Sequence, residues 1–301
     1  MLPNVPALLL DRLKSQYGPD LAAEIVNGFV RRPVTLRVNT LKADRASVCA
    51  VLDRAGISYD AVPWYEDAFI LHDVREEAVQ SLPEYEAGHM YLQSLSSMLP
   101  PLVVAPGKNE SILDMAAAPG GKTTQMAALS ANTALITACE KNKIRAERLQ
   151  FNLDRQGARR VSVMCQDARQ LNDLFKFDKV LLDAPCTGSG TILIAEGEPE
   201  RRMTPDWVAK TASTQKAMLK KALTLLSVGH EMVYSTCSIL QEENEAVLKV
   251  VLPAMNAEIV PIEHAFLQHA PLLPVTIPGV VCVRPTALFE GFFVAKIRKK
   301  K

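Results

Sequence analysis

The feature that most constrains the fold is a repeated alternation of short apolar runs with helical segments, which begins near Gly88 and continues through most of the chain. This alternation is typical of parallel strands joined by crossover helices, which cover both faces of one sheet. The predicted strands lie at 111–115, 134–139, 161–165, 178–182 and 231–235. The part of the chain from 86 to 301 is therefore predicted to form a doubly wound α/β domain.

The segments around and after the last of these strands predict how the sheet closes. A long helix is expected over 205–226, because Thr204 can cap its first turn and leucines recur along one face. A second helix is expected near 242–253. Two later apolar runs should add an antiparallel pair to the otherwise parallel sheet; they lie at 279–283 and 291–297.

The first 85 residues have a different pattern. Residues 4–30 have helical spacing, residues 33–39 alternate like a strand, and residues 44–56 form an amphipathic helical pattern. We expect a small N-terminal α/β domain over 1–85, followed by the larger domain over 86–301. The N-terminal portion carries nine basic and twelve acidic residues, so the weak positive balance of the chain comes from the larger domain.

Composition excludes several classes of protein. The 301 residues carry a formal charge of +1 and are 48% hydrophobic, which argues against a disordered chain or a coiled coil. No apolar run reaches the roughly 18–20 residues that a membrane helix needs, and no secretory signal is evident, so we expect a cytoplasmic protein. The six cysteines include no CxxC pair, and the five histidines have no metal-binding spacing, so free thiols and no metal are expected.

A turn of small residues follows the first strand of the predicted sheet. It contains Ala116, Ala117, Ala118, Pro119, Gly120, Gly121, Lys122 and Thr123. In doubly wound sheets ligands bind at this edge, because small residues let the backbone approach the ligand and the next helix offers free N–H groups. A nucleotide triphosphatase with Asp183 as its magnesium ligand is an alternative, but Ala116 replaces the first glycine of that loop.

Acidic residues stand at the ends of successive predicted strands. Asp114, Glu140, Asp167 and Asp183 would all lie at or near the same edge of the sheet. A single acid at such a place is usually a turn or cap residue, whereas four in succession favour a ligand site. Glu140, at the end of the second strand, suits the hydroxyl groups of a ribose, which favours a cofactor of the nucleoside type.

Two cysteines occupy equivalent places after neighbouring strands. Cys186 follows the fourth strand and Cys237 follows the fifth, so both should face one crevice near helix N-termini, where thiolates are favoured. The remaining cysteines are expected to be small buried residues; they are Cys49, Cys139, Cys165 and Cys282.

With these residues in place, the chain resembles the NOL1/NOP2/Sun family of S-adenosylmethionine-dependent RNA 5-methylcytosine methyltransferases. The resemblance rests on the turn at 116–122, the Asp-Ala-Pro-Cys motif at 183–186 and the Thr-Cys-Ser motif at 236–238. Further matches lie at 32–40, 91–97 and 290–293. The resemblance implies a Rossmann-like class I methyltransferase fold with a small N-terminal α/β domain.

The resemblance also implies a chemistry. Carbon 5 of cytosine is a weak nucleophile, and adding a thiolate to carbon 6 activates it. By resemblance Cys237 is this nucleophile, Asp183 hydrogen-bonds the cytosine ring, and Cys186 assists release of the product. The cofactor S-adenosylmethionine would be held by Ala116, Ala117, Ala118, Pro119, Gly120, Gly121, Lys122, Glu140, Asp167 and Asp183.

The partner implied is RNA, with ribosomal RNA expected before transfer RNA, free or in a ribosomal precursor particle. By resemblance Arg37 and Asn39 line the substrate side, and other arginines are candidate phosphate ligands; these include Arg31, Arg32, Arg201 and Arg202. A monomer without metal or membrane contact is expected. A non-catalytic RNA-binding ribosome assembly factor is a third hypothesis, but such a factor would be expected to lose Cys237 or Asp183.

Overall fold

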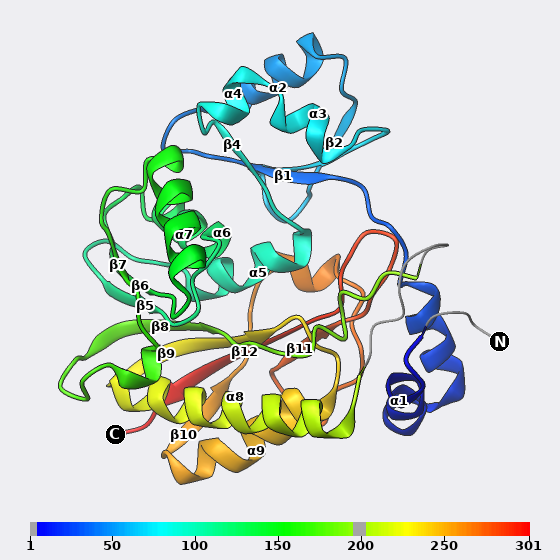
Figure 1. Cartoon of the computed structure of the whole chain (residues 1–301), viewed down its shortest axis with the longest axis vertical. Helices are drawn as coiled ribbons and strands as arrows, with labels where there is room; N and C mark the ends of the chain where they lie inside the picture. Colours follow the sequence, from blue (N-terminus) through cyan, green and yellow to red (C-terminus); the bar gives the residue numbers. More distant parts are fainter. Residues whose placement is uncertain (1–4, 195–202) are drawn as a thin grey trace.

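The computed structural model describes residues 5–194 and 203–301, which form a large α/β domain and a small domain beside it (Figure 1). Five parallel strands make up the core of the large sheet, in the order β9, β8, β5, β6, β7. Their bounds are β5 Ser111–Asp114, β6 Leu135–Cys139, β7 Val161–Met164, β8 Phe177–Asp183 and β9 Leu226–Thr236. All five predicted parallel strands are confirmed.

Antiparallel strands complete the sheet beyond β9. β12 (Phe292–Lys299) pairs antiparallel with β9, and it also pairs with β10 (Ala257–Val260) and β11 (Val281–Val283). The expected antiparallel pair of C-terminal apolar runs is therefore present. The predicted fold class, a mostly parallel doubly wound sheet with an antiparallel C-terminal strand, is confirmed.

Helices cover both faces of the large sheet (Figure 1). On one face lie α5 (Leu95–Val104), α6 (Gly121–Leu129) and α7 (Lys143–Gln156), and on the other lie α8 (Pro205–Leu225) and α9 (Glu245–Ala254). The Thr204 hydroxyl accepts a hydrogen bond from the Trp207 backbone N–H (3.2 Å), as expected for the cap of α8. Short 3-10 turns lie at Ala168–Gln170, Gln241–Glu243 and Ala265–Gln268.

The small domain is an antiparallel sheet with the strand order β2, β3, β1, β4. The strands are β1 Thr35–Val38, β2 Tyr59–Ala61, β3 Ala68–Leu71 and β4 Met90–Leu92, and the helices are α2 Arg45–Arg54, α3 Glu76–Gln80 and α4 Pro83–Glu86. Its sheet thus continues to Leu92, beyond the expected boundary at residue 85, because β4 supplies the partner for one edge of β1.

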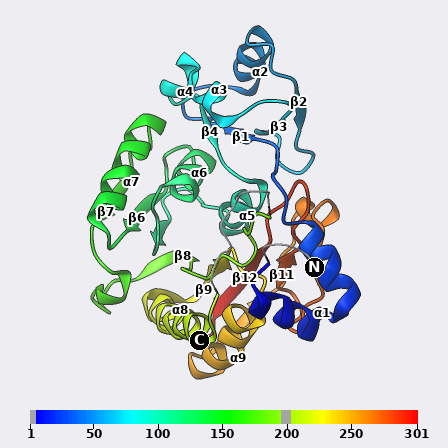
Figure 2. The same cartoon turned by 45° about the vertical axis from the view of Figure 1, so that its right-hand side comes forward.

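The first helix packs with the large domain instead of the small sheet. Leu9, Leu13 and Ile25 of α1 (Ala7–Asn27) are buried in the same core as α8 and α9. The Tyr17 hydroxyl donates to the Ile239 carbonyl (3.0 Å), which lies two residues after Cys237. Figure 2 shows α1 beside the end of the sheet that carries β11 and β12. α1 therefore supports the segment that follows β9.

None of the helices in 5–194 and 203–301 is long and apolar enough to span a membrane.

Candidate active site

The site lies where three neighbouring parallel strands end. β8 pairs with β5 on one side and with β9 on the other, so Asp114, Asp183 and Thr236 come to one edge of the sheet. The turn at 115–120 leaves β5, Cys186 follows β8, and Cys237 follows β9. Strand order therefore brings together the turn, the aspartate and both cysteines that the sequence singled out.

The turn after β5 is shaped by glycine and anchored by a buried acid. Gly120 has a φ of 110°, and a Cβ added there would lie 3.0 Å from Leu149 Cδ1. Asp114 is 1% exposed, and its Oδ2 accepts a hydrogen bond from Thr123 Oγ1 (2.7 Å). Burial raises the pKa of Asp114 to about 6, although the Thr123 hydroxyl favours the ionised form.

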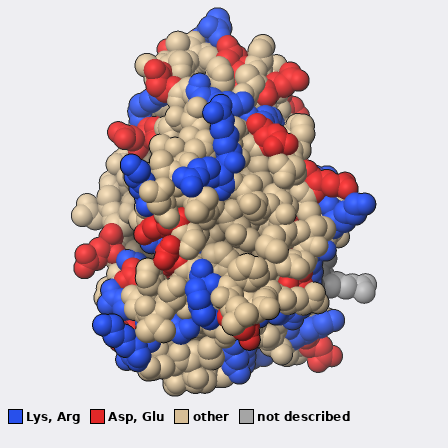
Figure 3. Space-filling view, turned by 90° about the vertical axis from the view of Figure 1, so that its left-hand side faces the viewer, with Lys and Arg blue, Asp and Glu red and all other residues tan. Residues whose placement is uncertain are grey.

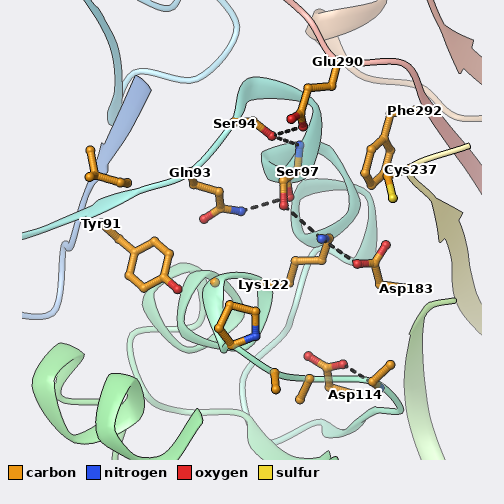
Figure 4. A pocket seen from close by; sticks show the side chains of 16 residues that line it. Tyr91, Gln93, Ser94, Ser97, Asp114, Lys122, Asp183, Cys237, Glu290 and Phe292 are labelled. Atoms are coloured by element: carbon orange, nitrogen blue, oxygen red, sulfur yellow. Dashed lines mark hydrogen bonds and ion pairs between the residues drawn. The ribbon is translucent and has the colours of Figure 1, made fainter. Parts of the chain in front are cut away.

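Lys122 and Asp183 form an ion pair inside the site (Figure 4). The Lys122 Nζ lies 2.7 Å from Asp183 Oδ2 and donates to Ser97 Oγ (2.9 Å), while the Ser235 hydroxyl donates to Asp183 Oδ1 (2.7 Å). Burial disfavours the charged lysine, but the Asp183 carboxylate outweighs this effect, so the pKa of Lys122 is raised. Both charges are thus held in fixed places at the carboxyl edge.

The two motif cysteines are in contact. The Sγ atoms of Cys186 and Cys237 lie 3.1 Å apart, and both side chains are partly buried. A hydrogen bond from the Cys186 thiol lowers the pKa of Cys237, to which the Lys122 cation also contributes, while the same contact and burial raise the pKa of Cys186. The hydrogen bond between the two sulfur atoms therefore favours a thiolate at Cys237 and a thiol at Cys186, although burial and the Asp183 carboxylate oppose the charge on Cys237.

Two adjoining cavities open around these groups. One, of about 290 Å³, is lined by Tyr91, Gln93, Ser97, Lys122 and Phe292 (Figure 4). The other, of about 260 Å³, extends toward Glu140, Asp167 and Ala168. The cavities share Ala116, Ala118, Asp183 and Cys237. An elongated molecule in the second cavity would therefore reach a second molecule in the first at the point where Cys237 lies.

Glu140 and Asp167, which the sequence places at this edge of the sheet, line the second cavity. Glu140 is 4% exposed, accepts from the Asn142 N–H (2.9 Å) and lies 3.4 Å from Arg145, so its carboxylate is fixed by the start of α7. Asp167 pairs with Arg169 (2.6 Å), and this hydrogen-bonded guanidinium lowers the pKa of Asp167. Both acids can accept hydrogen bonds from hydroxyl or amino groups.

The expectation that Arg37 and Asn39 line the substrate side requires a correction. Both side chains are 0% exposed. Arg37 donates to Gln93 Oε1 (2.9 Å) and Thr124 Oγ1 (2.6 Å), and Asn39 donates to the Gln156 carbonyl at the end of α7 (2.7 Å). Their hydrogen bonds point inward because β1 is covered by the large domain. They join the small domain to the cofactor-side helices and touch no open surface.

Two further expectations have mixed outcomes. Cys139 and Cys282 are buried as predicted, but Cys165 is exposed because it follows the edge strand β7, and Cys49 is half-buried. Arg201 and Arg202, proposed as phosphate ligands, lie outside the described residues.

Several residues of the site were not singled out by sequence reasoning. Ser97 and Gln93 lie in the 91–97 element that carries part of the family resemblance, so a signal for them existed. Ser235, which orients Asp183, has no comparable signal, because serine at a strand end is common. Glu243 also escaped notice; its side chain is fully buried and accepts hydrogen bonds from Thr187 and Ser238, the residues that directly follow the two cysteines.

Comparison with known proteins gives matches over nearly the whole chain. Residues 101–298 match the family described as 16S rRNA methyltransferase RsmB/F, and residues 5–76 match a ferredoxin-like domain described as RsmF/B-like. The 28S rRNA (cytosine(4447)-C(5))-methyltransferase of Homo sapiens is 37% identical over 90% of this chain and 35% of its own length. The ribosomal RNA small subunit methyltransferase F of Vibrio vulnificus is 33% identical over 98% of this chain and 64% of its own. The chain therefore spans less than two thirds of these relatives.

Solved structures match over the full length. A methyltransferase homologue from Pyrococcus horikoshii is 32% identical, with a TM-score of 0.82 over 98% of this chain and 100% of its own. NSun6 from Pyrococcus horikoshii, solved with SFG, is 26% identical, with a TM-score of 0.89 over 100% of both chains.

The buried Asp114 makes stability depend on pH in a predictable direction. Its pKa is raised to about 6 on folding, so its ionisation destabilises the folded state as pH rises through about 6. We expect Asp114→Asn, which keeps an oxygen acceptor for Thr123, to be more stable than the wild type at pH 8 by up to about 3 kcal/mol. The difference should shrink as pH falls to 5. Urea unfolding at both pH values measures it.

Asp178→Asn provides the matched control. Hydrogen bonds from Ser111 lower the pKa of Asp178, so this substitution should destabilise the protein at pH 8. A stability difference for Asp114→Asn that is the same at pH 5 and pH 8 would show that Asp114 does not titrate in this window.

Proposed function

Because the chain belongs to the 16S rRNA methyltransferase RsmB/F family, we propose that it transfers a methyl group from S-adenosylmethionine to carbon 5 of a cytosine in RNA. The observation that carries the proposal is the contact of Cys237 with Cys186, 3.1 Å apart, beside the Lys122–Asp183 pair. This arrangement provides a thiolate, a neighbouring thiol donor and a fixed carboxylate at the junction of two cavities. Family membership agrees with the NOL1/NOP2/Sun resemblance of the sequence.

The residues around the second cavity fit the proposed cofactor. Glu140 offers carboxylate oxygens for ribose hydroxyls, and Asp167 can accept from the adenine amino group. The loop 116–122 brings backbone and small side chains to the junction, beside Asp183. When bound, S-adenosylmethionine supplies an electrophilic methyl group. NSun6 from Pyrococcus horikoshii, which aligns over the full chain, was solved with SFG.

The proposed mechanism assigns the first step to Cys237. Its thiolate adds to carbon 6 of the cytosine, and the electron pair of the 5,6 double bond moves toward carbon 5 and the ring. Asp183, held by Lys122 and Ser235, hydrogen-bonds the ring and keeps carbon 6 in reach of the sulfur. Carbon 5 then takes the methyl group. Transfer of the carbon-5 proton to water restores the double bond and expels the Cys237 sulfur as a thiolate, which the Cys186 thiol stabilises by donating its hydrogen bond again.

Contacts in the site disfavour the triphosphatase alternative. Lys122 is committed to Asp183 and Ser97, and the Thr123 hydroxyl donates to Asp114. In a phosphate-binding loop the lysine contacts phosphates and the threonine hydroxyl contacts magnesium. A non-catalytic assembly factor would be expected to lose Cys237 or Asp183. Both residues are present, and both line the two cavities, which disfavours this alternative.

The proposed substrate is ribosomal RNA, with transfer RNA second. The human and Vibrio relatives are named as ribosomal RNA methyltransferases. We propose that the protein acts in the cytoplasm as a monomer, on free RNA or on a ribosomal precursor particle.

On the face that carries α7 and β7, Lys and Arg are interspersed with Asp and Glu instead of forming one continuous basic surface (Figure 3).

We further propose that RNA approaches through a groove beside the first cavity. This groove, of about 410 Å³, is lined by Arg31, Arg32 and Thr191, and it shares Gln93, Ser94 and Glu290 with that cavity. The Ser94 hydroxyl donates to Glu290 Oε2 (2.6 Å). Arg31 is exposed, so its guanidinium can pair with a phosphate next to the target nucleotide.

The activity is tested by incubating the protein with tritium-labelled S-adenosylmethionine and total RNA from a strain that lacks the gene. Label should enter 5-methylcytidine after digestion to nucleosides, and size fractionation of the RNA should place it in ribosomal RNA. Cys237→Ala is the matched blank. Label in another nucleoside would contradict the proposed reaction, and label in transfer RNA would change the proposed substrate.

Substitution of the two cysteines tests their roles separately. Cys186→Ala should accumulate a protein–RNA adduct that survives denaturation, because addition of Cys237 still occurs while release is impaired. Cys237→Ala should form none. The adducts are measured as shifted bands on denaturing gels, with Cys165→Ala, at an exposed cysteine outside both cavities, as the control. The reverse pattern would make Cys186 the nucleophile.

The groove is tested by Arg31→Ala in steady-state methylation assays. The KM for RNA should rise about 3–10-fold with kcat little changed, because the phosphate contact stabilises the bound ground state and the transition state equally. The salt dependence of binding should fall by a slope of about 1. Arg159→Ala, at an exposed arginine outside the groove, is the control. If Arg31→Ala and Arg159→Ala change the KM for RNA equally, RNA does not bind along the groove.

A further inference from the structure

Glu243 is a buried carboxylate that joins the two loops carrying the cysteines. It ends the short turn Gln241–Glu243 and is 0% exposed. Its Oε1 accepts from the Thr187 N–H (2.7 Å), and its Oε2 accepts from Thr187 Oγ1 (2.6 Å) and Ser238 Oγ (2.5 Å). Thr187 directly follows Cys186, and Ser238 directly follows Cys237. One side chain therefore fixes the neighbours of both sulfur atoms.

The hydrogen-bond pattern around Glu243 suits its ionised form. The Thr187 N–H can only donate. The Ser238 hydroxyl accepts from the Leu240 N–H (3.1 Å) and contacts Ser189 Oγ (2.8 Å), so its own proton is free to point at Glu243. Burial raises the pKa of Glu243, but three donors aimed at its two oxygens favour the carboxylate.

Different charged groups act on the two sulfur atoms. Cys186 faces Glu243 as well as Cys237, whereas Cys237 faces the Lys122 cation and the carboxylates of Asp183 and Glu290. Tyr234 and Glu242 are further titratable groups near Glu243; the Tyr234 hydroxyl donates to the Glu243 carbonyl (2.6 Å), and Glu242 pairs with Arg12 (2.8 Å). A carboxylate beside Cys186 disfavours a second negative charge there.

We propose that Glu243 is a positioning residue that assigns the single thiolate of the cysteine pair to Cys237. It does so in two ways, by holding the two loops so that the sulfurs touch and by keeping Cys186 protonated as the hydrogen-bond donor. The inference rests on the proposed function for its catalytic meaning, since Cys237 is the proposed nucleophile. Which of the two sulfur atoms carries the proton can be measured without RNA or cofactor.

The test is pH-dependent alkylation of the purified full-length protein by iodoacetamide, with each cysteine followed by peptide mass spectrometry. In the wild type, Cys237 should be alkylated at lower pH than Cys186. Glu243→Gln keeps the shape and removes the charge. The ratio of Cys186 to Cys237 alkylation should rise about tenfold, with a fall of about one pH unit in the midpoint for Cys186.

Two further variants separate charge from position. Glu243→Asp keeps the charge but is one methylene shorter. It should give the wild-type alkylation ratio, but its kcat for methyl transfer should be lower than that of the wild type, because the two loops are no longer held in the same position. Glu242→Gln removes a neighbouring carboxylate that pairs with Arg12, and it should change neither quantity. An alkylation ratio in Glu243→Gln within twofold of that in Glu242→Gln would overturn the proposal.

The outcomes distinguish this inference from the proposed function. If the wild type methylates RNA but the ratio does not respond to Glu243→Gln, only the role of Glu243 fails. If the ratio responds but the wild type transfers no methyl group to cytosine, the assignment of the proton stands and the proposed function fails. If circular dichroism shows that Glu243→Gln is not folded, the wild-type protein alone tests the proposal. Alkylation of Cys186 at lower pH than Cys237 in the wild type would overturn it.

Discussion

The constraint on which the rest of the structure depends is the adjacency of β5, β8 and β9 as parallel strands. Their carboxyl ends meet at one edge, and each contributes one part of the site. The Lys122–Asp183 pair exists because β5 and β8 are neighbours, and the Cys186–Cys237 contact exists because β8 and β9 are neighbours. A different strand order would leave the same residues at strand ends but would separate them by the width of a strand or more.

Local sequence patterns predicted the elements that depend on interactions between residues close together in the chain. The five parallel strands and the cap of α8 follow from apolar runs and from the hydroxyl of Thr204, which act over a few residues. The burial of Arg37 and the pairing of β4 with β1 could not be predicted this way, because both depend on segments dozens of residues apart. An arginine in a strand is exposed far more often than buried, so its sequence signal pointed to the surface.

The site is assembled at a cost in stability. Asp114 is buried with a raised pKa, and Lys122 keeps its charge in the interior because Asp183 is next to it. Removing one partner of such a pair leaves an uncompensated charge, whereas the intact pair fixes the geometry of both. Glu243 is a similar case, because burial raises its pKa while three hydrogen-bond donors favour its carboxylate. These buried charges lie around the Cys186–Cys237 contact, and the leucine- and valine-rich cores of both sheet faces compensate for their cost in stability.

Arg37 connects the small domain to this charged centre. Its guanidinium donates to Gln93, which lines the first cavity, and to Thr124 and the Gly121 carbonyl at the start of α6, next to Lys122. Burial lowers the pKa of Arg37, but arginine stays charged because its ordinary pKa is so high. A shift of β1 would therefore displace the wall of the first cavity and the helix that carries Lys122 together. The small domain and the cofactor-side turn thus behave as one unit, although the sequence separates them by more than eighty residues.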